Sequence, residues 1–397
     1  MGHRLGYLSA APRVSTRSEA ELGGPRSHVL GVMNAFETLG WQVKPFIVGD
    51  GVPLSWIVKG SEQSMRRSTV RVLLADLMRI GMRLSNGRRA WHEIDSDIDW
   101  VYERFAAFQS LGGAFRKRGI LWILETNAPL FIESKQDRKT LILSSLAKYF
   151  EAKAYRECDV LVCISEELKN IILEKMTIPP EKIFVMPNGV DIDFFDPDQY
   201  QANRQFKGFT IGFVGTLIEW QGLDSLLETV SELRLDGLDV NLVFVGNGPS
   251  RDLLEEKAIL LGLSDHSKFV GHVAREDVPS FIAGFDIGFS GQIPLKVGRM
   301  YLSPLKLYEY MAMAKPVIAS DFEDSRSVIV DQKTGFLYPG GNKRKLQRAI
   351  LAAFESRSRL PQMGKQARIT IVNNHSWQAR VTSLIEFIES MESADLR

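Results

Sequence analysis

Residues 209–246 read FTIGFVGTLIEWQGLDSLLETVSELRLDGLDVNLVFVG and contain a full pattern of strand, helix and strand. The apolar run FTIGFVG (209–215) ends in glycine, LDSLLETVSELRL (223–235) carries leucines at helical spacing, and VNLVFVG (240–246) is again a short apolar run. Two short runs around an amphipathic helix are typical of parallel strands joined by a crossover. This stretch therefore favours an α/β fold, in which helices cover a parallel sheet.

The same alternation extends in both directions along the chain. Downstream, the expected strands are KFVGH, DIGFS, KPVIAS and TGFLYP; in the first half they are RLGYLS, WQVKPFIV, ILWILET, DVLVCIS and KIFVMPN. Each set has its own helices, such as SHVLGVMNAFETLG in the first half. We therefore expect two doubly wound, Rossmann-like domains, residues 1–195 and 206–375, which face a central cleft where a ligand binds at strand ends. Residues 191–208, polar and aperiodic, form the expected join. Residues 376–397 form an amphipathic helix that packs back on the first domain.

Composition limits the class of protein further. The 49 basic and 48 acidic side chains leave a formal charge of +1, which argues against a dedicated nucleic-acid binder. No apolar run reaches the roughly 18 residues needed to span a bilayer, and the first residues lack the core of a secretory signal. We expect a cytoplasmic protein in which Cys158 and Cys163, the two cysteines, are buried and reduced.

The segment RMYLSPLKLYEYMAMAKPVIAS, residues 299–320, carries the most chemical information. Ser303 and Pro304 predict a helix start, with serine as N-cap and proline at the first helical position. Lys306 then lies in the first turn, where the helix dipole disfavours a cation unless an anion binds there. Lys306 and the free N–H groups of residues 303–306 predict a diphosphate site without a metal, and Glu309 on the same face could accept bonds from a ribose. An ordinary core helix with a solvated lysine and glutamate is the alternative.

These residues belong to a longer series of motifs. In order, the chain contains GGPRSHV, VMPNGVD, VGTLIEWQG, VGNGP and FVGHVAREDVPSFIAGFDIGF before the helix at 304. Together they resemble the retaining glycosyltransferases of family 4, which have the two-domain GT-B fold. The resemblance covers most of the chain and implies transfer of a sugar from a nucleotide diphosphate sugar, with retention and without a metal cofactor.

Residue by residue, the resemblance gives a mixed result. Glu309 matches the second glutamate of the family's paired motif, which binds the nucleotide ribose, but the first glutamate is replaced by Tyr301. The arginine and lysine that usually contact the diphosphate correspond to the uncharged Thr216 and Gln221. Lys306 is the candidate replacement cation, with Arg299 and Lys296 as weaker ones.

The remaining site residues also follow from the resemblance. Asn127, in ETNAP after the strand ILWIL, is expected against the donor sugar, with Glu125 as a possible companion. The expected catalytic set is Lys306, Glu309 and Asn127. The expected donor-binding residues are Gly23, Gly24, Gly215, Thr216, Gln221, Gly246, His272, Val273, Tyr301, Leu302, Ser303, Pro304, Leu305, Lys306 and Glu309. The loop at Gly23 could instead be a plain turn, and the His272 imidazole could be structural. The aspartates at 95, 97 and 99 are interpreted as solvated loop charge, and those at 191 and 193 as part of the inter-domain turn, rather than as a metal site.

One surface feature stands apart from the balanced composition. Residues 61–90 hold seven arginines against Glu62 and Asp76, a local charge of +5, with Val70, Leu73, Leu74, Leu77 and Leu84 at helical spacing. A basic amphipathic helix of this kind could lie on an anionic membrane or hold a lipid diphosphate. It could equally pack on the first domain with its arginines in water.

The sequence thus predicts a glycosyltransferase that acts in polysaccharide or glycoconjugate biosynthesis. UDP is the default nucleotide and UDP-glucose the default donor, with a saccharide or lipid-linked saccharide as acceptor. Because Tyr301, Thr216 and Gln221 depart from the family pattern, a non-catalytic nucleotide-sugar or glycan binding protein is the alternative. A dehydrogenase is disfavoured because Arg251 stands where the third glycine of a dinucleotide fingerprint would be.

Overall fold

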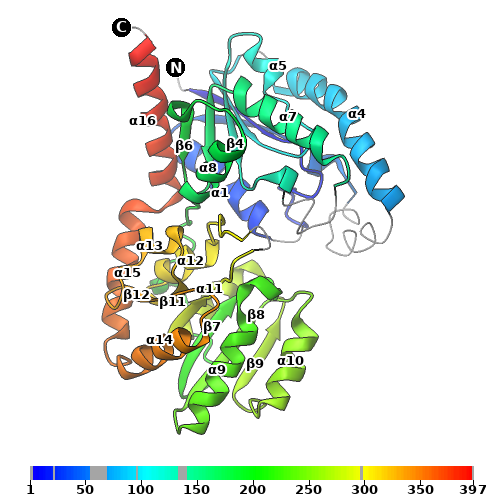
Figure 1. Ribbon diagram of the computed structural model, residues 1–397. Helices are drawn as coiled ribbons and strands as arrows, with labels where there is room; N and C mark the ends of the chain where they lie inside the picture. The colour runs from blue at the N-terminus through cyan, green and yellow to red at the C-terminus, as the bar shows by residue number, and fades with distance from the viewer. Residues whose placement is uncertain are drawn as a thin grey trace. The chain divides into compact units, whose positions relative to one another are not determined.

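The computed structural model describes residues 3–20, 23–53, 69–94, 97–132, 141–295 and 298–395 (Figure 1). Contacts divide the chain into two compact units. Unit 1 comprises Met1–Pro187, Tyr301–Ser303 and Trp377–Arg397, and unit 2 comprises Asn188–Met300 and Pro304–Ser376. Residues 191–208 therefore belong to unit 2, where Phe195 is buried in the core rather than lying in a loose linker.

Unit 1 contains a six-stranded parallel sheet with strand order β2-β1-β3-β4-β5-β6. Its strands are β1 (Arg4–Ser9), β2 (Gln42–Ile47), β3 (Trp100–Arg104), β4 (Leu121–Thr126), β5 (Val160–Cys163) and β6 (Ile183–Val185). The described helices are α1 (Gly24–Thr38), α4 (Thr69–Ile94), α5 (Gly113–Arg116), α7 (Ser144–Glu157), α8 (Glu166–Lys175) and α16 (Trp377–Asp395). Strand β3 is missing from the sequence prediction, although its first four residues are buried.

Unit 2 contains a second six-stranded parallel sheet, with strand order β12-β11-β10-β7-β8-β9. Its strands are β7 (Phe209–Val214), β8 (Val240–Val245), β9 (Ser267–Gly271), β10 (Ile287–Ser290), β11 (Val317–Ser320) and β12 (Gly335–Tyr338). The described α-helices are α9 (Leu223–Leu235), α10 (Arg251–Leu260), α11 (Val278–Ala283), α12 (Leu305–Ala312), α13 (Glu323–Val328), α14 (Lys343–Glu355) and α15 (Leu360–Asn374). All six expected strands are present.

Alternation along the strands explains the three layers of unit 2. In β8, Leu242 and Phe244 enter one core with α9, α10 and α14, whereas Val243 and Val245 enter another with α11, α12 and α15 (Figure 1). A parallel sheet buried on both faces needs such continuous apolar strands. Both units therefore have the layered α/β architecture that the sequence predicts.

Helix α16 packs against α1 inside unit 1. Trp377, at its first position, lies edge-on to the His28 ring with the centroids 5.0 Å apart. Val381, Leu384 and Ile388 are buried along the same helix. The apolar face that the sequence predicts for this helix is therefore buried against unit 1.

Two further observations concern the cysteines and the membrane. Cys158 and Cys163 are free and buried, as expected, and burial raises the pKa of Cys158 to about 12. Within the described ranges, no helix is both long enough and apolar enough to cross a bilayer.

Candidate functional site

The strand order of unit 2 indicates where a ligand would bind. The direction in which successive strands are added to the sheet reverses between β7 and β10, which are parallel neighbours: β8 and β9 extend to one side, and β11 and β12 to the other. In open parallel sheets, ligands bind at the carboxyl ends of the strands at such a switch point. Gly215 follows β7, and the polar pair Ser290 and Gln292 closes and follows β10. The site is therefore sought among these residues and their contacts.

Lys306 enters this group from α12. It is 8 % exposed, and its ammonium donates to Oε1 of Gln221 at 2.9 Å. The same Nζ lies 4.4 Å from the centre of the Phe213 ring, a favourable cation-π arrangement. No carboxylate lies within ion-pair distance of it among the residues that the structure describes. The site thus contains a buried cation without a direct counter-ion.

Burial shifts the pKa values of Lys306 and Glu309, both on α12, toward each other. It lowers the pKa of Lys306 to about 7, against the opposing effect of the Glu309 carboxylate. It also raises the pKa of Glu309 to about 7, against the attraction of Lys306 and Arg275. The two groups stand three residues apart on one helix and interact, so they titrate as a pair.

The sequence analysis missed several polar groups around this lysine. Gln292 donates from Nε2 to Oε1 of Gln221 at 3.4 Å, and the same Nε2 donates to Oγ of Ser290 at 3.1 Å. Ser290 is fully buried and Gln292 is 2 % exposed. A serine and a glutamine after the apolar run DIGF were the available signal, which gains meaning only from the neighbours that the fold provides. Arg275 was missed as well; its guanidinium stacks 4.0 Å from the centre of the Phe194 ring.

The glycine turn after β7 brings backbone close to the ammonium. Gly215 has a φ of +135°, and a Cβ built there would lie 3.3 Å from Cε and Nζ of Lys306. Its N–H bonds the carbonyl of Val245, and Gly246 follows β8 directly beside it. Thr216 is half-buried next in sequence. Gly215, Gln221, Gly246 and Lys306 are thus brought together, as a shared site requires.

Three other expected residues of unit 2 differ in how far they are exposed to solvent. His272 is exposed, and Val273 packs in part against the apolar core. Leu305 is half-buried at the first position of α12. In the part of the chain that the structure describes, the His272 ring is not among the contacts of Lys306.

The start of α12 differs from the prediction. The helix begins at Leu305, and its N-cap residue is Pro304, which has an extended backbone and no side-chain cap. The prediction that Ser303 caps the helix was therefore wrong, because the extended ψ of Pro304 delays the first helical residue. Tyr301, Leu302 and Ser303 belong by their contacts to unit 1, where Ser165 donates to the Tyr301 carbonyl at 2.7 Å.

Unit 1 holds the remaining predicted residues. Gly23 is the extended N-cap of α1, and Gly24 is its first residue. Asn127 follows β4 and is half-buried. Its Nδ2 donates to Oε1 of Glu125, and its Oδ1 accepts from Arg104 at 3.4 Å. Glu125 itself is fully buried and bonds the side chains of His28, Tyr102 and Asn127.

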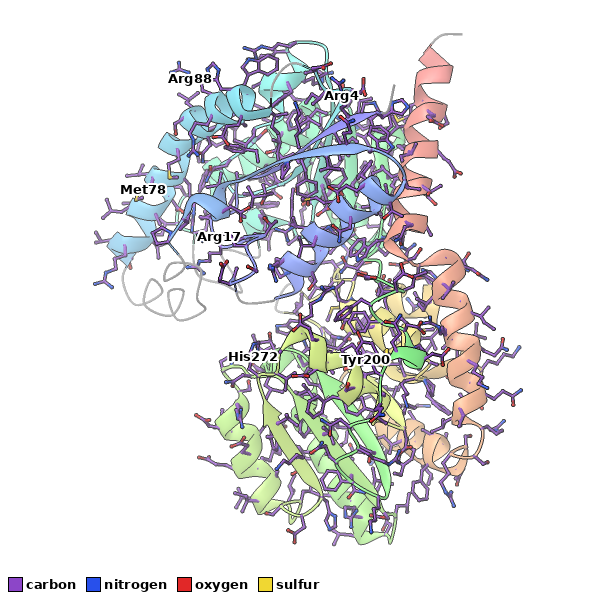
Figure 2. The ribbon with its side chains drawn as sticks, turned by 180° about the vertical axis from the view of Figure 1, so that it is seen from behind. Arg4, Arg17, Met78, Arg88, Tyr200 and His272 are labelled. Atoms are coloured by element: carbon purple, nitrogen blue, oxygen red, sulfur yellow. The ribbon has the colours of Figure 1, made fainter. Side chains whose placement is uncertain are left out.

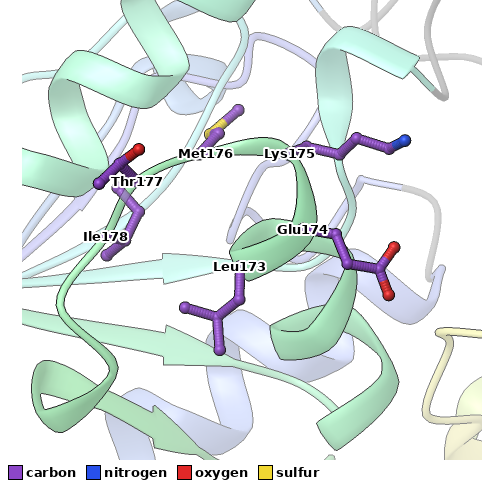
Figure 3. A pocket seen from close by; sticks show the side chains of 6 residues that line it. All are labelled: Leu173, Glu174, Lys175, Met176, Thr177 and Ile178. Atoms are coloured by element: carbon purple, nitrogen blue, oxygen red, sulfur yellow. The ribbon is translucent and has the colours of Figure 1, made fainter.

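Other local features carry less chemistry. Within the described ranges, no group of three His, Cys, Asp or Glu side chains is arranged to hold a metal; Asp95 lies outside those ranges. A hollow of about 360 Å³ is lined by consecutive residues 173–178 at the end of α8. Figure 3 shows its charged side chains, Glu174 and Lys175, extending away from Thr177 and Ile178. The hollow therefore lacks the convergent polar groups of a catalytic pocket.

Comparison with known families covers nearly the whole chain. Residues 22–194 match the family described as Glycosyltransferase Family 4, and residues 196–370 match Glycosyl transferases group 1. An uncharacterized glycosyltransferase of Methanocaldococcus jannaschii is 23% identical over 309 residues, which is 76% of each chain. A GDP-mannose-dependent alpha-(1-6)-phosphatidylinositol monomannoside mannosyltransferase of Mycobacterium tuberculosis is 25% identical over 224 residues, 54% of this chain and 58% of that one.

Solved structures agree on the fold. Sucrose-phosphate synthase from Thermosynechococcus elongatus superposes over 99% of this chain and 100% of its own, with a TM-score of 0.72 at 14% identity. Anabaena Alr3699/HepE, solved in complex with UDP-glucose, superposes over 98% of this chain and 99% of its own, with a TM-score of 0.62 at 16% identity. The two six-stranded parallel sheets and the paired family matches lead to one conclusion: this chain is a glycosyltransferase of family 4 with the GT-B fold.

Proposed function

We propose that this glycosyltransferase binds a nucleotide diphosphate sugar in unit 2 and moves its hexose to a saccharide or lipid-linked saccharide bound in unit 1. The observation that carries the proposal is the buried ammonium of Lys306 at the switch point, held by Gln221 alone among polar partners in the described chain. A buried cation without a counter-ion costs free energy, which a bound diphosphate would offset. The site is therefore arranged for an anionic ligand.

The chemistry follows from where charge develops. When the nucleoside diphosphate leaves the anomeric carbon, negative charge accumulates on its phosphate oxygens, and fixed positive groups stabilise that charge. In the proposal, Lys306 and the N-terminus of α12 supply this stabilisation without a metal, and Glu309 accepts hydrogen bonds from the ribose. Retention of anomeric configuration, with the acceptor attacking on the leaving-group side, is part of the same proposal and rests on the family.

The donor is proposed to be a UDP-hexose, with UDP-glucose as the first candidate. The support is the fold shared with Alr3699/HepE, whose structure contains UDP-glucose. The mycobacterial relative is named for GDP-mannose, so GDP-mannose is the donor to test against it. That relative is also named for a phosphatidylinositol mannoside, which supports a lipid-linked acceptor and a role in the synthesis of polysaccharide or glycoconjugate.

Association with an anionic membrane surface is proposed through α4. The outer row of this helix is Val70, Leu74, Leu77, Met78 and Leu84, all more than half exposed. The inward side instead buries the polar Asp76 and Asn86. Figure 2 shows Met78 and Arg88 pointing away from the body of unit 1. Exposed apolar side chains beside arginines suit the interface of an anionic bilayer. Residues 61–68, which complete the predicted basic segment, lie outside the described ranges.

Thermal unfolding with a panel of ligands tests the proposal. UDP, GDP, ADP, UDP-glucose, GDP-mannose and NAD are each added, and one at 100 times its dissociation constant should stabilise the folded protein by about 2.7 kcal/mol. We expect a selective shift with UDP and UDP-glucose, followed by slow release of UDP from UDP-glucose. Binding without any turnover, with or without added acceptors, would instead support the non-catalytic binding protein. If no nucleotide raises the midpoint, the donor site proposed in unit 2 is refuted.

A further inference from the structure

A second set of polar groups lies at the switch point of unit 1. Here the direction in which strands are added to the sheet reverses between β1 and β3, which are parallel neighbours. Ser9 pairs in register with Arg104, and Arg104 pairs with Glu125 on β4, so the three residues form one row across the strand ends. Ser9 Oγ and Arg104 Nε are buried and make no hydrogen bond with any residue in the described ranges.

Glu125 is the centre of this row. It is fully buried, and its Oε2 bonds Nε2 of His28 at 2.6 Å and the hydroxyl of Tyr102. Burial alone would raise its pKa, but the His28 ring and Arg104 outweigh burial and lower the pKa to about 2. The carboxylate is therefore ionised at all working pH values, with its Oε2 oxygen already occupied.

The Oε1 oxygen of Glu125 is the one that reaches Asn127. It accepts from Nδ2 of Asn127, while Arg104 donates to Oδ1 of the same amide. A flipped amide would place oxygen against the carboxylate and N–H groups against the guanidinium, which is repulsive at both ends. The amide orientation is thus set from two sides. One N–H and one lone pair of Asn127 stay available for a ligand.

We propose that Glu125 is a positioning residue, which acts with Arg104 to hold the Asn127 amide in the single orientation needed to contact a sugar hydroxyl. This inference rests on the proposed function, and it corrects the expectation that Glu125 is itself a companion contact of the sugar. His28 and Tyr102 hold the carboxylate, the carboxylate holds the amide, and only the amide meets the ligand. A hydroxyl both donates and accepts hydrogen bonds, so it matches the remaining N–H and the remaining lone pair of the Asn127 amide.

Two neutral variants of nearly equal size separate hydrogen bonding from charge. Glu125→Gln keeps an oxygen that can accept from Asn127, whereas Glu125→Met removes it, and both remove the carboxylate. The readout is the rate at which UDP is released from UDP-glucose, or GDP from GDP-mannose if the panel selects that donor, in the presence of a mixture of saccharide acceptors, because the acceptor is proposed to bind in unit 1. We expect Asn127→Ala and Glu125→Met each to lower kcat by about 100-fold, the scale for a misplaced reacting group, and Glu125→Gln by less than about 10-fold.

A double variant of Glu125 and Asn127 measures the coupling between these two residues and is the second part of the experiment. If Glu125 acts through Asn127, Glu125→Met added to Asn127→Ala should lower kcat no further. Glu103→Gln is the matched control, because Glu103 is also a fully buried acid of this sheet but bonds the backbone N–H groups of Leu111 and Gly112 rather than Asn127. It should lower thermal stability and leave kcat unchanged. Equal kcat in Glu125→Met and Glu125→Gln, or multiplying effects in the double variant, overturns the proposal.

A measurement on the unaltered chain covers the case in which the Glu125 variants do not fold. The side-chain amide of Asn127 is assigned by nitrogen-15 NMR from the signal lost in Asn127→Ala. We expect the Nδ2 proton that is donated to Glu125 to exchange slowly with water, because a buried carboxylate holds it. Rapid exchange overturns the positioning role. Failure of the proposed function looks different: the wild-type protein would then neither bind nor hydrolyse any nucleotide sugar.

Discussion

Lys306 and Gln221 come from different elements yet meet at 2.9 Å. The family resemblance would place a lysine at position 221, and here that position is an uncharged glutamine whose oxygen faces an ammonium supplied by α12. A cation that has moved in the sequence but not in space would explain why the glutamine is tolerated. The idea is testable, because the charge can be moved back.

We predict that Lys306→Ala weakens binding of the donor nucleotide by about 1.5 to 3 kcal/mol, the range for a hydrogen bond to a charged group. The double variant Lys306→Ala with Gln221→Lys should regain most of that affinity, measured by calorimetry with UDP. Lys315→Ala is the control, since Lys315 in the same unit donates to the Ala283 carbonyl. Unchanged affinity in Lys306→Ala would remove this lysine from the site.

Donor binding should also depend on pH around neutrality. As pH rises through about 7, Lys306 loses its proton and Glu309 becomes ionised, and both changes disfavour an anion. We therefore expect the dissociation constant of UDP-glucose to increase between pH 6 and pH 8.5. A nucleotide sugar is used because its diphosphate, esterified at both ends, has no proton to lose near pH 7. Lys306→Arg, charged throughout, should flatten the profile; an equally steep profile in that variant would contradict the assignment.

At the scale of elements, the sequence pattern predicted the strands well and their boundaries less well. All strands of unit 2 were expected because each is a short apolar run. Strand β3, WVYER, was missed because Glu103 and Arg104 break the run, and only the fold shows that Glu103 is buried against backbone N–H groups. Helix α4 was expected as amphipathic, but spacing alone could not show that its leucines face outward and its Asp76 inward, where Asp76 accepts from the N–H groups of Ile142 and Leu143.

In the candidate site, too, single residues could be predicted from the sequence, whereas their contacts could not. Lys306 and Gln221 could be singled out from sequence, yet their contact depends on how β7 and α12 pack. Ser290, Gln292 and Arg275 were not predicted, because single polar residues after a strand are common and gain meaning only from their neighbours. The link from His28 to Asn127 connects α1 with β4, residues almost a hundred positions apart. No local pattern contains such a contact.

The junction of α1 and α16 is set by one glycine. A Cβ at Gly31 would lie 2.2 Å from Nε1 of Trp377, so Gly31→Ala must push the two helices apart. We expect it to destabilise the protein by about 1 to 3 kcal/mol in denaturant unfolding, the usual cost of overpacking. Gly81→Ala in α4, where a Cβ meets open space, should instead stabilise by about 1 kcal/mol. Equal stabilities of the two variants would show that the contact is not tight.

At the scale of the whole molecule, the two units use the same principle with different strand orders. In unit 2 the direction of strand addition reverses beside β7, and Gly215, Gln221, Gln292 and Lys306 gather there. In unit 1 it reverses beside β1, and Ser9, Arg104, Glu125 and Asn127 gather at the corresponding strand ends. Each unit therefore presents polar groups where a parallel sheet can receive a ligand. In our proposal, the cation-centred site in unit 2 binds the diphosphate and the amide-centred site in unit 1 contacts a sugar.

The surface of α4 leads to the last prediction, which concerns where the protein acts. We expect the protein to sediment with vesicles of phosphatidylcholine and phosphatidylglycerol, and not with phosphatidylcholine alone, because arginines contribute about 1 kcal/mol each near an anionic surface. Arg71→Gln with Arg88→Gln should then weaken binding by about 2 kcal/mol, or roughly 30-fold.

The apolar row is tested separately from the charge. Leu74→Glu with Leu77→Glu should abolish sedimentation with the anionic vesicles. Leu253→Glu with Leu260→Glu on α10, which are exposed leucines of unit 2, should leave it unchanged. Because apolar side chains enter the bilayer while arginines act from its surface, high salt should weaken wild-type binding without removing it. Sedimentation that is independent of anionic lipid, or equal in the two leucine pairs, would show that α4 does not dock on a membrane.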